Sequence, residues 1–143
     1  GIASLLLDNL GNTIRVSLTA PPIEEIKTAV LILESVKLRH AKPEIISCPT
    51  CGRTEINLQK LLNIVELKID ELKRKGKKFK PAKIAIMGCA VNGPGEAKDA
   101  DLGISGAKHS QIIIFRKGKI IGSYTENKGI NLFFKLITKD IIE

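Results

Sequence analysis

Apolar and polar positions follow two different periods along the 143 residues of this chain. A period of two over residues 13–18 places the three aliphatic side chains on one side, which predicts a strand. Two prolines follow that strand, and helical spacing of apolar residues then predicts a helix over residues 22–38. Such a strand–helix pair is the unit from which parallel α/β barrels are built.

The remaining pattern predicts a separate α/β domain. Short apolar runs favour strands at residues 44–47, 83–87, 102–105, 111–115 and 119–124. Helical spacing favours helices over residues 56–75 and 129–142, with a single turn at residues 96–100. The first helix should bury one stripe of its surface: Leu58, Leu62, Val65, Ile69 and Leu72. We therefore expect two units, residues 1–41 and residues 42–143.

Composition excludes several classes of protein. Hydrophobic residues make up 43% and charged residues 27%, which is typical of a folded domain. No apolar run approaches the ~20 residues of a membrane span, so we expect a soluble protein without a membrane partner. Aromatic residues are 3% and Trp is absent, which argues against nucleic acid as a partner. The first residue is Gly1, so we expect a fragment or a processed product.

The net charge of +8 has two explanations. It comes from 23 Lys and Arg residues against 15 Asp and Glu residues, with lysine in large excess over arginine. A lysine-rich bias of the coding sequence explains the excess without any function. Alternatively, a basic face attracts an acidic partner.

Three cysteines are the sharpest chemical signal. Cys48 and Cys51 form a C-x-x-C pair after one predicted strand, and Cys89 follows another. An odd number cannot close a full set of disulfides. The pair by itself fits a redox dithiol, half a zinc site or part of an iron–sulfur site. Zinc needs four ligands, and His40 or His109 could supply the fourth.

The loop around Cys89 allows close approach to a bulky group. Three glycines and a proline fall within residues 88–95, and the carboxylate of Glu96 follows. Glycine permits positive φ and close backbone contacts, and N–H groups in such a loop could hydrogen-bond cluster sulfides. A phosphate-binding loop is an alternative, but its G-x-x-x-x-G-K-[ST] pattern is missing.

Two segments carry a resemblance to a known family. They are Ser47–Arg53 (SCPTCGR) and Met87–Ile104 (MGCAVNGPGEAKDADLGI), with Gly11–Thr19 (GNTIRVSLT) upstream. Together they resemble the 4-hydroxy-3-methylbut-2-enyl diphosphate synthase family, also called GcpE, over essentially the whole chain. The resemblance implies that residues 42–143 form an α/β cluster domain similar to those of sulfite and nitrite reductases. It also implies that residues 1–41 are the last strand and helix of a TIM barrel, most of which is missing.

The resemblance also implies a ligand set. Carried over residue by residue, the family pattern assigns a [4Fe–4S] cluster to Cys48, Cys51, Cys89 and Glu96. A carboxylate is a harder and more labile ligand than a thiolate, which leaves one iron able to meet a substrate oxygen. Asn92 would then lie beside the substrate near that iron.

Three further residues are candidate substrate contacts. Arg15 and Ser17 alternate to the face opposite Val16, where they would line the barrel near a diphosphate or simply satisfy polar groups within the barrel core. Arg53 follows the cysteine pair directly and would hold the diphosphate or support the cluster.

The resemblance implies an iron–sulfur oxidoreductase of the non-mevalonate isoprenoid pathway. Its reaction is the reductive ring opening and dehydration of 2-C-methyl-D-erythritol 2,4-cyclodiphosphate to 4-hydroxy-3-methylbut-2-enyl diphosphate. Ferredoxin or flavodoxin would supply electrons to a homodimeric full-length enzyme of the bacterial cytoplasm or, alternatively, of a plastid or apicoplast. We expect the fragment alone to be inactive. The alternative is a non-enzymatic electron-transfer or zinc-binding module, and the missing fourth cysteine argues against the electron-transfer form.

Overall fold

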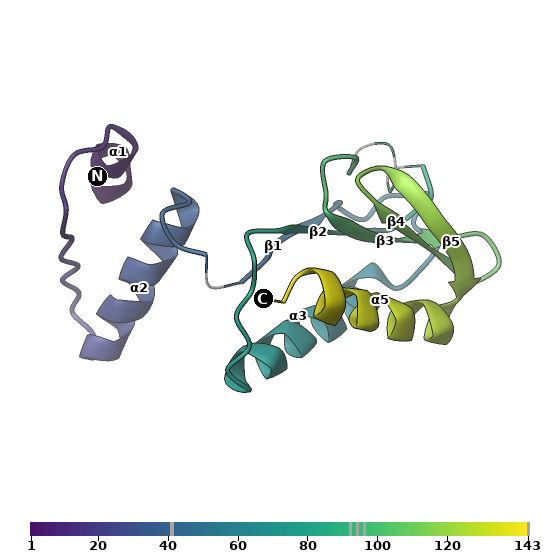
Figure 1. Cartoon of the computed structure of the whole chain (residues 1–143). Coiled ribbons are helices and arrows are strands. Elements are labelled where there is room, and N and C mark those ends of the chain that lie inside the picture. Colours follow the sequence, from purple (N-terminus) through teal and green to yellow (C-terminus); the bar gives the residue numbers. More distant parts are fainter. Residues whose placement is uncertain (41, 92, 94, 96, 143) are drawn as a thin grey trace. The chain divides into compact units, whose positions relative to one another are not determined.

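The computed structural model describes residues 1–40, 42–91, 93, 95 and 97–142. The chain divides into two compact units, Gly1–Ala41 and Lys42–Glu143 (Figure 1). Among the described residues, no helix is both long enough and apolar enough to cross a membrane.

The N-terminal unit holds two helices, α1 (Ile2–Leu7) and α2 (Pro22–Ser35). The strand predicted over residues 13–18 is wrong, because this segment has no regular structure. A strand needs hydrogen bonds from a neighbouring strand, and the described residues of this unit supply none. Ile14 and Val16 are still less exposed than their polar neighbours, whereas Leu18 is exposed.

Helix α2 begins and ends for local reasons. Pro22 occupies its first turn, and Glu24 and Glu25 in that turn favour the positive end of the helix dipole. The helix ends at Ser35, earlier than predicted, and Lys37 takes a φ of 60°, the left-handed conformation that commonly terminates helices. Neither α1 nor α2 contains a buried residue.

Over the described residues, the C-terminal unit is a five-stranded sheet with two long helices on one face (Figure 1). The strands lie in sequence order: β1 (Glu44–Ser47), β2 (Lys83–Met87), β3 (Leu102–Ala107), β4 (Gln111–Arg116) and β5 (Lys119–Thr125). Strands β1, β2 and β3 are mutually parallel, and β4 and β5 continue the sheet antiparallel. All five predicted strands are confirmed, with ends displaced by at most two residues.

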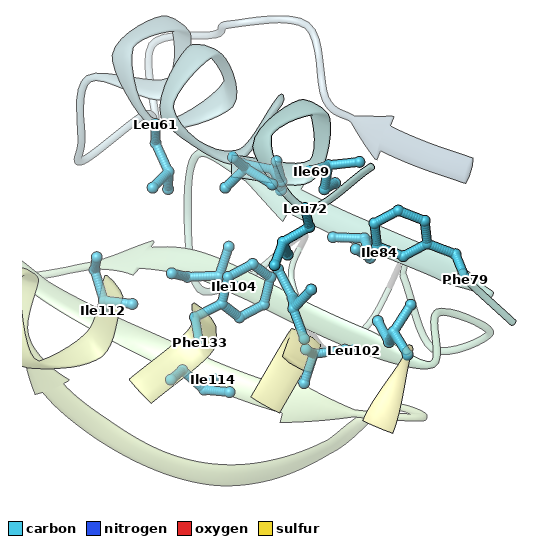
Figure 2. Packing of buried hydrophobic residues seen from close by; sticks show 14 of the residues in the cluster. Leu61, Ile69, Leu72, Phe79, Ile84, Leu102, Ile104, Ile112, Ile114 and Phe133 are labelled. Atoms are coloured by element: carbon cyan, nitrogen blue, oxygen red, sulfur yellow. The ribbon is translucent and has the colours of Figure 1, made fainter. Parts of the chain in front are cut away.

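The main core lies between the sheet and the helices α3 (Leu58–Arg74) and α5 (Glu126–Asp140) (Figure 2). Alternate strand residues such as Ile84 and Ile104 point toward these helices and are fully buried. Phe133 of α5 belongs to the same core cluster and packs onto the sheet from the helix layer. The mixed α/β fold class predicted from the sequence is therefore confirmed.

The stripe predicted for α3 is wrong at one position. Leu61 is 4% exposed and belongs to the core, whereas Leu62 is half-buried at its margin. The helix also begins later than predicted, because the Asn57 side chain accepts a hydrogen bond of 3.0 Å from the Lys60 N–H and caps the first turn.

A second, smaller apolar cluster lies on the opposite face of the sheet. It is made of Ala85, Met87, Ala97, Ala100 and Phe115, with Cys48 packed against it. The Phe115 ring fills the space over Gly103, where an added Cβ would lie 2.1 Å from the ring. The chain after β2 therefore contributes to covering this face, and that stretch carries the third cysteine.

Candidate cysteine site at the carboxyl ends of β1 and β2

The two segments that carry the three cysteines follow neighbouring strands at one end of the sheet. Cys48 follows β1 directly, and Cys89 lies two residues past β2. Because β1 and β2 are adjacent and parallel, their carboxyl ends meet at the same edge, where open α/β sheets commonly bind ligands. Cys89 is buried, Cys48 is partly buried and Cys51 is exposed. The site therefore has a buried side and a side open to solvent.

Backbone hydrogen bonds tie the two cysteine-bearing segments together. The Gly88 N–H donates to Cys48 Sγ over 3.2 Å. The Gly88 carbonyl accepts from the Glu55 N–H over 2.9 Å. Since Gly88 precedes Cys89, these two bonds fix the start of the Cys89 loop against the C-x-x-C segment.

The C-x-x-C turn is closed by Thr54. Its N–H donates to the Cys51 carbonyl over 3.0 Å, and its Oγ1 accepts from the Cys51 N–H over 3.2 Å. The backbone N–H of Arg53 lowers the pKa of the Cys51 thiol, with smaller contributions from the Arg53 and Thr54 side chains and a desolvation effect that opposes them. A hydrogen bond to the thiolate favours the form that ligates metals and attacks electrophiles.

The loop after Cys89 lies directly on β3. The Gly93 N–H donates to the Cys89 carbonyl over 3.2 Å. An added Cβ at Gly93 would lie 2.6 Å from Ser105 Oγ, so only glycine fits there without displacement. Ser105 is fully buried, and within the described part of the chain its hydroxyl has no hydrogen-bond partner.

Several predicted site residues lie elsewhere or outside the described ranges. Asn92 and Glu96 lie outside the described residues, as does part of the turn expected at residues 96–100, so their roles stay predictions. Arg53 is exposed beside Cys51. Arg15 and Ser17 are exposed residues of the irregular segment 13–18, and no strand there directs them into a barrel.

The structure does not assemble a single-ion site from the residues that it describes. Among them, no group of three or more His, Cys, Asp and Glu side chains is placed to hold one metal ion. A zinc ion needs its donors around one point, whereas the ligands of an iron–sulfur cluster bind separate irons.

A cavity of about 390 Å³ lies at the other end of the sheet, beside Asp101, Arg116 and Lys117. Lys117 and Asp101 approach within 4.0 Å, and Arg116 pairs with Asp140. Arg116 and Lys117 thus already have acidic partners, and no cysteine lines this cavity.

Two residues that the sequence reasoning did not single out shape the site. An added Cβ on Gly106 would lie 2.5 Å from the Gly88 carbonyl oxygen, so β3 passes directly against the Cys89 segment. A glycine inside a strand pattern is a signal for such an approach. Thr54 carries no comparable signal, because its contact with Gly88 joins segments far apart in sequence.

The fold and the thiols define a class: an α/β domain that presents cysteines at the carboxyl ends of two parallel strands. The family model described as "GcpE protein C-terminal domain" matches residues 44–139. The chain belongs to this family.

Relatives with curated names extend the similarity into the N-terminal unit. The chain is 47% identical over 97% of its length to a protein of Ruminiclostridium cellulolyticum and 49% identical over 99% to one of Fusobacterium nucleatum. It is 47% identical over 88% of its length to a protein of Bacillus subtilis. All three are named 4-hydroxy-3-methylbut-2-en-1-yl diphosphate synthase (flavodoxin). The matches cover 37%, 38% and 32% of those proteins, so the chain spans less than two-fifths of their length.

Proposed function

We propose that this chain is the cluster-binding part of a 4-hydroxy-3-methylbut-2-enyl diphosphate synthase. That enzyme would open 2-C-methyl-D-erythritol 2,4-cyclodiphosphate reductively and eliminate water in the non-mevalonate isoprenoid pathway. The observation that carries the proposal is that the two cysteine-bearing segments follow adjacent parallel strands in a GcpE-family chain.

The donor set suits a [4Fe–4S] cluster, because thiolates are the usual ligands of such clusters. Cys48, Cys51 and Cys89 would hold it, and Glu96 would be the fourth ligand. The Gly88 N–H donates to Cys48 Sγ, and the Arg53 N–H lowers the pKa of the Cys51 thiol. When bound, such a cluster supplies single electrons and a Lewis-acidic metal.

The chain's own polar side chains would position the substrate. Arg53 offers an exposed guanidinium beside Cys51, and guanidinium groups bind phosphate oxygens through paired hydrogen bonds. Asn92 would contact the substrate next to the cluster. Arg15 and Ser17 would contact its diphosphate.

The two units would have separate origins in the complete enzyme. We propose residues 1–41 as the last strand and helix of a TIM barrel, in which residues 13–18 become a strand once neighbouring strands pair with them. Residues 42–143 would be the domain similar to the cluster domains of sulfite and nitrite reductases. The complete enzyme would be a homodimer.

An acidic flavodoxin fits the charge of the C-terminal unit as electron donor, with ferredoxin as the alternative. Residues 42–143 carry 19 Lys and Arg against 11 Asp and Glu, whereas residues 1–41 carry four of each. The whole excess of +8 therefore belongs to the proposed cluster domain, which would attract an acidic protein and lose that attraction as salt rises. The organisms of the relatives fit a bacterial cytoplasm for the reaction.

A redox dithiol is the second candidate function. The lowered pKa of Cys51 in an exposed C-x-x-C turn favours it. Such a dithiol would need only Cys48 and Cys51, whereas a cluster also needs Cys89.

Turnover by the complete enzyme tests the proposal. The full-length protein containing this chain, prepared without oxygen, should convert the cyclodiphosphate when given reduced flavodoxin. Cys48→Ser and Cys89→Ser should both abolish product formation, and Glu96→Gln should depress it strongly while part of the iron remains. Full activity of Cys89→Ser would contradict the proposal of a cluster and would favour a redox dithiol made of Cys48 and Cys51.

A further inference from the structure

We infer that Thr54 is a positioning residue, which acts through its packing contact with Gly88 to fix the Cys51 turn relative to the Cys89 loop. The contact between the Thr54 side chain and the Gly88 Cα is called the Thr54–Gly88 contact below. Its relevance to a cluster rests on the proposed function, but the contact itself belongs to the protein.

Gly88 has no free space on the side of Thr54. An added Cβ would lie 2.9 Å from Thr54 Oγ1, 3.0 Å from its Cγ2 and 3.3 Å from its Cβ. On another side, an added Cβ at Gly106 would lie 2.5 Å from the Gly88 carbonyl oxygen. Gly88 therefore cannot yield toward β3 when Thr54 presses on it, because the sheet is already in contact there.

Any displacement of the Thr54 side chain also moves the C-x-x-C turn, because Thr54 is hydrogen-bonded to the Cys51 backbone. The same Oγ1 that contacts Gly88 accepts the hydrogen bond from the Cys51 N–H at 3.2 Å. The Thr54 N–H also bonds the Cys51 carbonyl at 3.0 Å. A shift of this side chain therefore moves the turn that carries Cys51.

Gly88 is linked to the other two cysteines. It precedes Cys89, and its N–H donates to Cys48 Sγ over 3.2 Å. A group held by sulfurs from both segments requires their spacing within a fraction of an ångström. The Thr54–Gly88 contact is the side-chain packing that sets this spacing.

Four variants separate the parts of this argument. Gly88→Ala adds the clashing Cβ and keeps the N–H bonded to Cys48. Thr54→Ser removes the methyl group and keeps the acceptor for the Cys51 N–H, whereas Thr54→Val keeps the shape and removes that acceptor. Gly52→Ala is the matched control, because an added Cβ in the same turn meets no atom within 4 Å.

The first readout is the rate at which the anaerobically reconstituted chain releases iron to a chelator, together with the EPR spectrum of the reduced cluster. Gly88→Ala should release iron about 10-fold faster or more and should change the spectrum, since residues around metal ligands typically affect affinity by 10- to 100-fold. Thr54→Val should also release iron faster, because it loses the acceptor for the Cys51 N–H. Thr54→Ser keeps Oγ1 and loses only Cγ2, so its rate should lie between those of wild type and Thr54→Val, whereas Gly52→Ala should stay within about twofold of wild type. The double variant Gly88→Ala with Thr54→Ser should recover part of the loss, because the removed methyl group makes room.

The second readout needs no cluster. In the iron-free chain, Gly88→Ala should lower the thermal midpoint, and adding Thr54→Ser should raise it again. If the wild-type chain binds no iron, the proposed function fails. The thermal midpoints of the iron-free variants then test the Thr54–Gly88 contact by themselves. A Gly88→Ala variant that behaves like Gly52→Ala, or a double variant no better than Gly88→Ala, overturns the inference. If Gly88→Ala does not fold, equal iron release by Thr54→Val and Thr54→Ser overturns it.

Discussion

The backbone N–H of Gly88 donates a hydrogen bond to Cys48 Sγ, although the two residues are forty positions apart in sequence. The bond joins the segment after β1 to the segment after β2, and parallel pairing of these strands brings both to one edge. Hydrogen bonds to a sulfur that ligates a cluster are among the factors that set the reduction potential of the cluster. The candidate ligand Cys48 thus accepts a hydrogen bond from the segment that carries Cys89, a second candidate ligand.

Ser105→Ala should stabilise the protein. The buried Ser105 hydroxyl has no partner among the described residues, and an unpaired buried hydroxyl costs free energy. We expect the free energy of unfolding in urea to rise by about 1 kcal/mol. Ser123→Ala is the control, because the exposed Ser123 hydroxyl donates to Gln111 Oε1 over 2.8 Å and its loss should not stabilise. A clear loss of stability in Ser105→Ala would mean that its hydroxyl has a partner.

Leu61→Ala should destabilise the C-terminal unit far more than Leu62→Ala. Leu61 is 4% exposed in the core, so its truncation leaves a cavity and costs about 2–5 kcal/mol. Leu62 lies at the margin of the core, and its truncation should cost about 1 kcal/mol. Urea unfolding of both variants measures the difference. A larger loss in Leu62→Ala would show that α3 packs with the stripe predicted from the sequence, and equal losses would contradict the difference in burial between the two residues.

Glu71→Gln should remove a small, pH-dependent part of the stability. Hydrogen bonds from Lys68 and Lys75, with their charges, lower the pKa of Glu71 from 4.5 to about 2. A carboxylate with a depressed folded pKa stabilises above pH 4.5 and loses that effect as the pH falls toward 2. The midpoint difference between wild type and Glu71→Gln should therefore be constant near neutrality and vanish near pH 2. Glu66→Gln removes an exposed carboxylate from the same helix and is the control, so an identical pH profile in both variants would contradict the assignment to Glu71.

This chain alone should not convert the cyclodiphosphate, even with cluster and reductant supplied. It spans less than two-fifths of the relatives that bear the synthase name, and in our proposal most diphosphate contacts lie outside it. Product formation is measured with the reconstituted chain and, as the positive control, with the full-length enzyme. Comparable turnover by the two would place the whole substrate site within residues 1–143.

Local sequence signals predicted the C-terminal unit well. The five strands are apolar runs bounded by turn residues. The C-x-x-C pair and the glycine-rich loop can be recognised from their residue types alone. The meeting of the two segments at one edge follows from the parallel pairing of β1 and β2, which only the structure shows.

The errors arise where structure depends on partners distant in sequence. Residues 13–18 have a strand pattern, but no neighbouring strand is present to pair with them. Leu61 and Leu62 both fit helical spacing, and only the packing of α3 on the sheet decides which is buried. The sequence did not predict a role for Thr54, because that role depends on its contact with Gly88, which is distant in sequence.

Iron and acid-labile sulfide per chain, measured on anaerobically reconstituted protein, test the central claim most directly. Wild type should contain about four of each and show the visible absorption of a [4Fe–4S] cluster. Cys48→Ser, Cys51→Ser and Cys89→Ser should each lose most of both. Wild-type protein that binds zinc but no sulfide, or a Cys89→Ser variant with undiminished iron and sulfide, would contradict the account.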